Sequence, residues 1–213
     1  MKRMLFHVFL WSWVLTVPVT ILGSYWTYHL LDRFFTYGVR YNPGAKVVSR
    51  ELSLGSIGHY ELNRMLQRVG AAISGYSREK PTELKAVYLF VPKSSLSVLE
   101  SHMPQSGFDY VKARVLINGK LAKGEIKYRG DTFYRWAWDK KSLRLKTSRE
   151  TLFEGMRSVN FLAARSHEQL NNYLSYRLGE LMGLVVPRTE LVRIFVNGKD
   201  RGVYFLVEQL KEI

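Results

Sequence analysis

The sequence lacks cysteine altogether, and its histidines are few. Without cysteine the chain can form no disulfide, no thiolate zinc site and no cysteine nucleophile. None of the histidines stands at the HxxH or HExxH spacing of a histidine metal site. The five positions are His7, His29, His59, His102 and His167. A chain without cysteine is compatible with the cytoplasm and with the exterior, so the compartment stays open.

Acidic residues are also scarce relative to basic ones. The 213-residue chain has 18 Asp and Glu against 32 Lys and Arg, which gives a formal charge of +14. This balance predicts an anionic partner, substrate or surface, without saying which anion. Hydrophobic residues make up 46% of the sequence and aromatic residues 14%, a composition typical of a folded chain and not of a disordered one. The length accommodates one sizeable domain with an appendage.

Charge is missing entirely from one stretch near the start. Met4–Leu31 contains no Asp, Glu, Lys or Arg, and it is longer than the roughly 20 residues that a helix needs to cross a bilayer. Pro18 lies mid-span, where a membrane helix tolerates a kink. We interpret residues 1–31 as an uncleaved membrane anchor. The alternative is a cleaved signal peptide, but Gly23-Ser24 is a poor cleavage site because bulky aromatic residues follow it.

The charges on the two flanks of this stretch orient it only weakly. Lys2 and Arg3 favour an N-terminus on the inside, but Arg33 and Arg40 lie on the other flank. We expect a single-pass membrane protein whose globular part lies outside the cytoplasm. Residues 32–85 are predicted to be a connector with an amphipathic helix over Ile57–Ile73 and no visible chemistry. Residues 86–213 are predicted to form the main domain.

Alternating apolar residues and turn signals predict a succession of strands in the main domain. Asn118-Gly119 and Asn197-Gly198 are the strongest short hairpin signals. Helical spacing that stops at Gly183 predicts a helix over Gln169–Met182, and Ser94–His102 can form a short one. The strands are expected at 84–91, 110–117, 121–128, 141–146, 159–162, 190–196 and 202–207. The predicted fold class is therefore α+β, with one or two helices packed on an antiparallel sheet.

One hairpin, Ile126–Lys146, carries an unusual number of cations. It has the pattern of a strand, an aromatic loop and a second strand. In the second strand, Leu143 and Leu145 fall on one face, and Arg144 and Lys146 fall on the other. Arg and Lys beside a glycine turn suit the oxygens of a phosphate or carboxylate. The alternative is a basic hairpin that only faces solvent.

Several motifs, taken in their order and spacing, resemble the CotH kinase family, named after spore-coat protein H. The resemblance extends roughly from Ala86 to the end of the chain. It includes the Tyr110–Gly119 strand with its NG turn. The other motifs are YRGDT at Tyr128–Thr132, WDKKSLRLK at Trp138–Lys146, VNFLA at Val159–Ala163, YLSYRLGELMGLVVPRTELVRIFVNG at Tyr173–Gly198 and GVYFLVEQ at Gly202–Gln209.

This resemblance implies an atypical protein-kinase fold that holds ATP and a divalent metal, Mg²⁺ or Mn²⁺, between two lobes. It implies action on secreted or surface proteins. Arg129, Lys141, Arg144 and Lys146 are the candidates for neutralising phosphate oxygens. Strand alternation places Lys141 on the opposite face from Arg144 and Lys146, so not all four reach one ligand. Glu208 corresponds to the family's linker between lobes, near the base of the nucleotide. For each of the five, an exposed strand residue is the alternative.

The sequence departs from the family's pattern at its end. The family's catalytic and metal-binding aspartates follow the strand that ends in the glutamate, whereas this chain stops at Ile213. Asp131, Asp139 and Asp200 lie in predicted loops and are poor substitutes. We therefore expect a fragment, a truncated product or a degenerate member. Enzymatic activity is left open, and no catalytic residue or metal ligand is assigned.

Two classes of function follow from these observations. The first is a membrane-anchored CotH-type kinase for extracytoplasmic proteins, represented here by its nucleotide-cradling portion. The second is a non-catalytic anion-binding module that docks on acidic surface polymers, lipids or proteins. A nucleic-acid partner is not expected, because an export-oriented anchor argues against it. The aromatic residues of the loop at that spacing are also more typical of a core or interface than of a stacking platform for bases; they are Phe133, Tyr134, Trp136 and Trp138.

Overall fold

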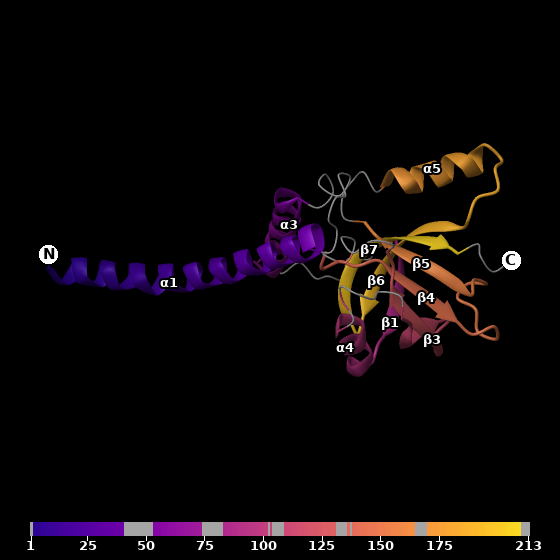
Figure 1. Ribbon diagram of the computed structural model, residues 1–213, viewed down its shortest axis with the longest axis horizontal. Helices are drawn as coiled ribbons and strands as arrows, with labels where there is room; N and C mark the ends of the chain where they lie inside the picture. The colour runs from indigo at the N-terminus through magenta and orange to yellow at the C-terminus, as the bar shows by residue number, and fades with distance from the viewer. Residues whose placement is uncertain are drawn as a thin grey trace. The chain divides into compact units, whose positions relative to one another are not determined.

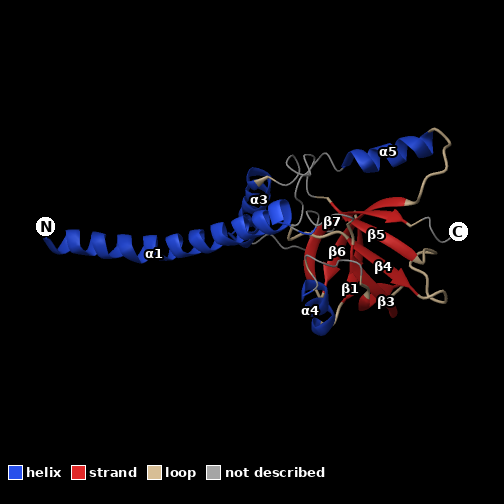
Figure 2. Cartoon of the chain, in the orientation of Figure 1, coloured by secondary structure: helices blue, strands red, loops and turns tan. Residues whose placement is uncertain are grey.

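The computed structural model describes residues 2–40, 53–73, 83–101, 103, 109–130, 136, 138–164 and 170–209. The chain divides into two compact units, Met1–Arg64 and Met65–Ile213. The boundary falls inside a helix, and the first strand of the second unit begins at Lys85. Figure 1 shows the elements in chain order, and Figure 2 distinguishes helices from strands.

The first unit is helical. It consists of α1 (Lys2–Arg33), the π-helix η1 (Phe34–Arg40) and the first half of α3 (Leu54–Ile73). Leu30 of α1 and Ile57 of α3 are its buried residues, and the Arg33 guanidinium lies 2.7 Å from the Glu61 carboxylate. These contacts join the end of α1 to the start of α3.

The uncharged N-terminal stretch forms one continuous helix, and Pro18 does not interrupt it. Among the described residues, Phe9–Tyr37 is long and apolar enough to cross a membrane, and none of its most apolar window is buried inside the protein. The Thr16 and Thr20 hydroxyls donate to backbone carbonyls four residues earlier, so neither polar group needs water. Length and composition thus agree with the predicted anchor, which the structure by itself does not test.

The second unit is built around a closed barrel of seven strands. The strand order around the barrel is β1-β2-β3-β4-β5-β7-β6. The strands are β1 (Lys85–Phe90), β2 (Val111–Ile117), β3 (Lys120–Tyr128), β4 (Leu143–Thr147), β5 (Ser158–Ala163), β6 (Thr189–Val196) and β7 (Lys199–Glu208). The mixed α+β class predicted from the sequence is confirmed, but the expected antiparallel sheet closes on itself.

A parallel pair closes the barrel. β1 runs parallel to β6, with Lys85 opposite Val192 and Leu89 opposite Val196, whereas all other neighbouring strands are antiparallel. Closure removes the exposed sheet edges that would otherwise pair with other chains. The two paired segments lie about a hundred residues apart in the sequence, so no local pattern reports their contact.

Alternation along each strand divides the barrel into an apolar interior and a polar exterior. β2 and β4 show it most clearly, since every second residue is buried. Residues that pair across strands share a face, so the interior includes one buried residue from each strand at similar depth. The largest fully buried side chains on the strands are Tyr204, Phe161, Leu89, Ile126, Leu145, Ile194, Leu206, Val87 and Val115.

Both predicted NG turns are confirmed. Asn118 and Gly119 have φ angles of 49° and 76°, and Asn197 and Gly198 have φ angles of 50° and 74°. Positive φ at both central residues is the type I′ geometry that matches the twist of a hairpin. The Asn197 side chain also accepts from Val91 N and donates to Val91 O, both at 2.8 Å. It therefore ties the β6–β7 turn to the end of β1.

Two helices accompany the barrel. α4 (Lys93–Ser101) follows β1 and buries Leu99, and α5 (Leu170–Leu181) packs on the outside of β7. Tyr173 and Tyr176 of α5 contact the Phe205 ring, with centroids 5.5 and 5.9 Å away. The predicted stop at Gly183 is confirmed by its φ of 75° and by the hydrogen bond from Leu184 N to Gly179 O. The opposite stripe of α5 is exposed: Leu174, Leu178 and Leu181.

Candidate anion-binding site

The basic hairpin forms as the sequence predicted. β3 pairs antiparallel with β4, from Gly124 opposite Thr147 to Tyr128 opposite Leu143. Leu143 and Leu145 point into the barrel, and Arg144 and Lys146 stand on its outer face. Trp136 and Trp138 of the connecting loop are buried, so they form core and offer no ring face to a nucleic-acid base. Asp131, Phe133 and Tyr134 lie outside the described residues.

The five predicted phosphate-binding residues do not converge on one point. On the outer face, Arg144 donates to the Asn160 side chain at 2.7 Å and to the Gln209 side chain at 3.0 Å. Lys146 lies over the Tyr110 ring, with its ammonium 5.8 Å from the centroid. The side chains of Arg144 and Lys146 therefore make their contacts on the outer face of the sheet. This position agrees with the expectation that they cannot share a ligand with Lys141.

Glu208 is the last residue of β7 and pairs near the start of β5, whereas Tyr128 is the last residue of β3. The two residues therefore lie at opposite ends of the barrel. Its carboxylate receives two hydrogen bonds from Arg188, at 2.9 Å from Nε and 2.8 Å from Nη2. These hydrogen bonds, together with the positive charge of Arg188, lower the pKa of the Glu208 carboxyl below its ordinary value. The Arg188 guanidinium also donates to the Glu154 carbonyl at 2.9 Å, so the pair clamps a turn to β7.

This ion pair gives a prediction for pH dependence. A carboxyl whose folded-state pKa is lowered stabilises the fold above its unfolded pKa, and the contribution is lost as the pH falls through the folded value. The free energy of unfolding should therefore drop between about pH 5 and pH 3 by up to ~1 kcal/mol from this pair, which is partly exposed. Glu208→Gln should remove that part of the drop. Urea midpoints at the two pH values test it, and an unchanged pH dependence in the variant would contradict the assignment.

Lys141 and Arg129 flank the other end of the barrel. Arg129 N donates to the Ser142 carbonyl at 2.8 Å, which holds the two ends of the loop together. Lys141 lines a pocket with a volume of about 90 Å³. Leu96, Leu99 and Glu100 of α4 form one wall of the pocket, and barrel strands with the β3–β4 loop form the rest. The strand residues are Ile126, Tyr128, Leu143, Val196, Arg201 and Tyr204, and the loop residues are Asp139 and Lys141.

The pocket combines an apolar floor with a charged mouth. Ile126, Leu143 and Val196 are inward-facing barrel residues and form the floor. At the mouth, the Tyr128 hydroxyl donates to Glu100, and the Lys141 ammonium lies 3.9 Å from the other Glu100 oxygen. Burial, with the hydrogen bond to Glu100, raises the pKa of the Tyr128 hydroxyl above its ordinary value. Tyr128 therefore stays a proton donor throughout the physiological range.

Two cations, Lys141 and Arg201, lie at the mouth of the pocket. The Lys141 ammonium also lies 5.4 Å from the Tyr128 ring centroid, and its 3.9 Å separation from Glu100 is longer than a direct hydrogen bond. Arg201 lines the same pocket and forms no ion pair or side-chain hydrogen bond within the described part of the chain. Arginine and lysine are the side chains that bind phosphate and carboxylate oxygens best.

The neighbouring Lys140 has a different role, which the sequence did not reveal. Its ammonium is buried and donates to the backbone carbonyls of Ala164, at 3.0 Å, and Val203. It also lies 4.7 Å from the centroid of the Tyr204 ring. Lys140 therefore joins the loop to the residue that follows β5 and to β7. Of the two adjacent lysines in the WDKKS motif, one is structural and the other faces the pocket.

The sequence reasoning missed Glu100 and Arg201. Glu100 lies on α4, before the motifs begin, and Arg201 follows the Asn197-Gly198 turn. Neither has a local pattern that marks it, because each reaches the pocket only through the closure of the barrel. A basic residue three positions after a hairpin turn is too common to have indicated a site.

The donor set of this pocket decides which implied cofactors it fits. Lys141 and Arg201 suit a phosphate group. For a divalent metal, the pocket offers the carboxylates of Glu100 and Asp139, and no group of three or more His, Asp or Glu side chains gathers among the described residues. Magnesium and manganese take oxygen ligands, and carboxylates are their usual protein donors. These residues by themselves do not make a metal site, so we derive no step through a metal.

Comparison with known proteins finds a match for part of the second unit. No curated protein matches the chain. A family model does match, and its matched region begins inside β3 and runs through β7. The match begins later than the resemblance inferred from the motifs, which reached back to Ala86. Residues 126–213 match the model of the family described as CotH kinase protein, and this match confirms at the family level the resemblance predicted from the sequence.

Proposed function

We propose that the protein is a CotH-type kinase-like protein, held in a membrane by α1, whose barrel carries the part that faces a nucleotide. The observation that carries the proposal is that the pocket lies largely within the segment that matches the family model. Of the eleven residues that line the pocket, all eight outside α4 lie within the matched segment 126–213. The motif lysine Lys141 is one of them. The barrel side of this cationic mouth thus belongs to the segment that resembles the family.

The size of the pocket limits what it takes. A ligand site for a whole small molecule usually has a volume of about 300–1,000 Å³. The pocket, with about 90 Å³, holds one compact group. In the proposed arrangement a terminal phosphate of ATP enters the mouth, and Lys141 and Arg201 neutralise its oxygens above an apolar floor. The remainder of the nucleotide lies outside the pocket. Four other residues remain predicted nucleotide contacts, but they are not among the residues that line this pocket: Arg129, Arg144, Lys146 and Glu208.

The further parts of the proposal rest on the family resemblance. They are a divalent metal, Mg²⁺ or Mn²⁺, protein substrates outside the cytoplasm, and an orientation that places the barrel there. In this proposal a second lobe supplies the metal-holding carboxylates, since phosphoryl transfer needs both a cationic cradle and metal-holding oxygens and the described residues gather no group of three or more His, Asp or Glu side chains.

A non-catalytic anion-binding module is the second candidate function. It is favoured by the fact that Arg144 and Glu208 are already engaged by neighbouring side chains. In such a module, acidic polymers, lipids or proteins would be held by surface charge and not by a single pocket.

Nucleotide binding by charge-matched variants separates the two. The full chain is kept in a neutral detergent, and ATP binding is measured by titration calorimetry. Loss of one charge-assisted contact should weaken ATP binding by about tenfold or more for Lys141→Met and for Arg201→Met. Lys120→Met removes one positive charge from an exposed position in β3 and should change ATP binding by less than about twofold.

The outcomes have distinct meanings. Selective loss at Lys141 and Arg201 supports the pocket. Equal losses at all three positions would show that ATP binds through diffuse surface charge, which contradicts the proposed site and favours the second function.

A further inference from the structure

The outer face of β2–β4 is strongly basic. Because residues paired across strands share a face, the register aligns Lys112 with Glu125 and Lys146, Arg114 with Lys123, and Lys127 with Arg144. Inward positions of the same strands are apolar and buried. The outward positions carry six cations and one carboxylate. We call these six residues the basic face: Lys112, Arg114, Lys123, Lys127, Arg144 and Lys146.

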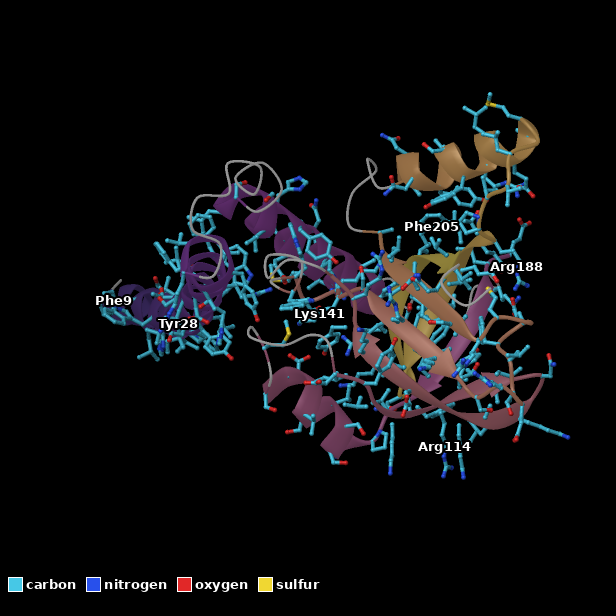
Figure 3. All side chains as sticks on the ribbon, turned by 45° about the vertical axis from the view of Figure 1, so that its right-hand side comes forward. Phe9, Tyr28, Arg114, Lys141, Arg188 and Phe205 are labelled. Carbon is cyan, nitrogen blue, oxygen red and sulfur yellow. The ribbon has the colours of Figure 1, made fainter. Side chains whose placement is uncertain are left out.

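Three of the six cations have no ion pair among the described residues. Lys112, Arg114 and Lys123 are exposed, and no ion pair engages them in the described ranges. Figure 3 shows the Arg114 side chain projecting away from the barrel. The ammonium groups of Lys127 and Lys146 lie 4.8 and 5.8 Å from the same Tyr110 ring centroid, so the ring holds two like charges near each other.

The chemistry of the basic face favours a broad anionic surface over a single small ligand. Four of its six cations are lysines, which act as point charges, whereas arginine is preferred for bidentate recognition of one phosphate. The face lies on the outside of a closed barrel, and the pocket described above opens elsewhere. A plane of phosphate groups can contact several of these side chains at once.

We propose that the basic face docks on the phosphate head groups of an anionic phospholipid bilayer. This inference rests on the anchor in the proposed function, because a chain tethered by α1 keeps the barrel within reach of a membrane surface at high effective concentration. It does not depend on nucleotide binding. The basic face and the ATP pocket use different residues, with Lys141 and Arg201 absent from the face.

The test measures lysine reactivity in the full chain. The protein is reconstituted in nanodiscs of phosphatidylcholine alone, or of phosphatidylcholine mixed with phosphatidylglycerol, without nucleotide. Acetylation of each lysine is followed by mass spectrometry. Docking should reduce the acetylation rates of Lys112 and Lys123 by about fivefold in the anionic nanodiscs. High salt should restore them. The exposed Lys93 and Lys199, which lie off the face, serve as internal controls and should not change.

A pair of charge-matched double variants adds a second readout. Lys112→Gln with Lys123→Gln should abolish the protection of Lys127, whereas Lys93→Gln with Lys199→Gln should leave it intact. Both pairs remove two charges, so net charge alone predicts equal effects.

Several results would overturn the inference. One is equal acetylation in the two kinds of nanodisc, and another is equal protection of Lys93 and Lys199. A third is protection of the face by added polyglutamate but not by phosphatidylglycerol, which would assign it to an acidic protein. If the chain does not stay with the nanodiscs, that result contradicts the membrane anchor and not the docking of the basic face. Lysine acetylation in the presence of phosphatidylglycerol vesicles then tests the docking by itself.

Discussion

Phe161→Ala should destabilise the protein by about 3–5 kcal/mol, the range for truncating a buried aromatic residue. Phe161 lies on β5, is fully buried, and shares the barrel interior with Leu143 and Leu206 on the two neighbouring strands. Its ring also meets Phe153 edge-on, with centroids 6.1 Å apart. Because the barrel is closed, surrounding strands cannot collapse into the cavity without breaking ladder hydrogen bonds. The free energy of unfolding is measured by urea denaturation with near-UV circular dichroism.

Phe90→Ala is the matched control for this prediction. Phe90 is also a strand phenylalanine, but 40% of its surface is exposed. Its truncation should cost about 1 kcal/mol or less. Equal destabilisation at the two positions would mean that Phe161 does not lie in a packed interior, and the strand assignment of β5 would then be wrong.

Lys140→Met should destabilise the protein by about 2–3 kcal/mol, because two charge-assisted hydrogen bonds to backbone carbonyls are lost. Lys140 is 9% exposed, and its ammonium donates to Ala164 O and Val203 O, so the variant removes this donor from both carbonyls. Methionine fills a similar volume, so the loss reports the polar contacts and not a cavity. The measurement is again the free energy of unfolding from urea titrations.

The adjacent Lys141→Met variant is the control. Lys141 faces the pocket and pairs loosely with Glu100, so its replacement should change stability by less than about 1 kcal/mol while weakening ATP binding. The two variants should therefore separate structure from binding at neighbouring positions. If Lys141→Met is the more destabilising of the two, the roles assigned to these lysines are reversed.

Much of the second unit could be predicted from local sequence signals. The NG turns at Asn118 and Asn197 were recognised because type I′ geometry demands positive φ, which asparagine and glycine tolerate. The placement of Leu143 and Leu145 on one strand face, opposite Arg144 and Lys146, followed from period-two alternation, and the end of α5 followed from Gly183. The motifs indicated the family whose model matches residues 126–213. In each of these cases the information lies within a few residues.

Other features were decided only by the tertiary structure. The parallel pairing of β1 with β6 closes the barrel, and it joins segments whose sequences carry no mark of each other. That closure brings Glu100 of α4 and Arg201 of β7 to the same mouth as Lys141. It also buries Lys140 against two carbonyls while its neighbour stays at the pocket. Alternation alone states that adjacent residues face opposite sides. Which side is enclosed, and which side chains meet there, depends on contacts between distant segments, since burial and hydrogen-bond partners are properties of the assembled barrel.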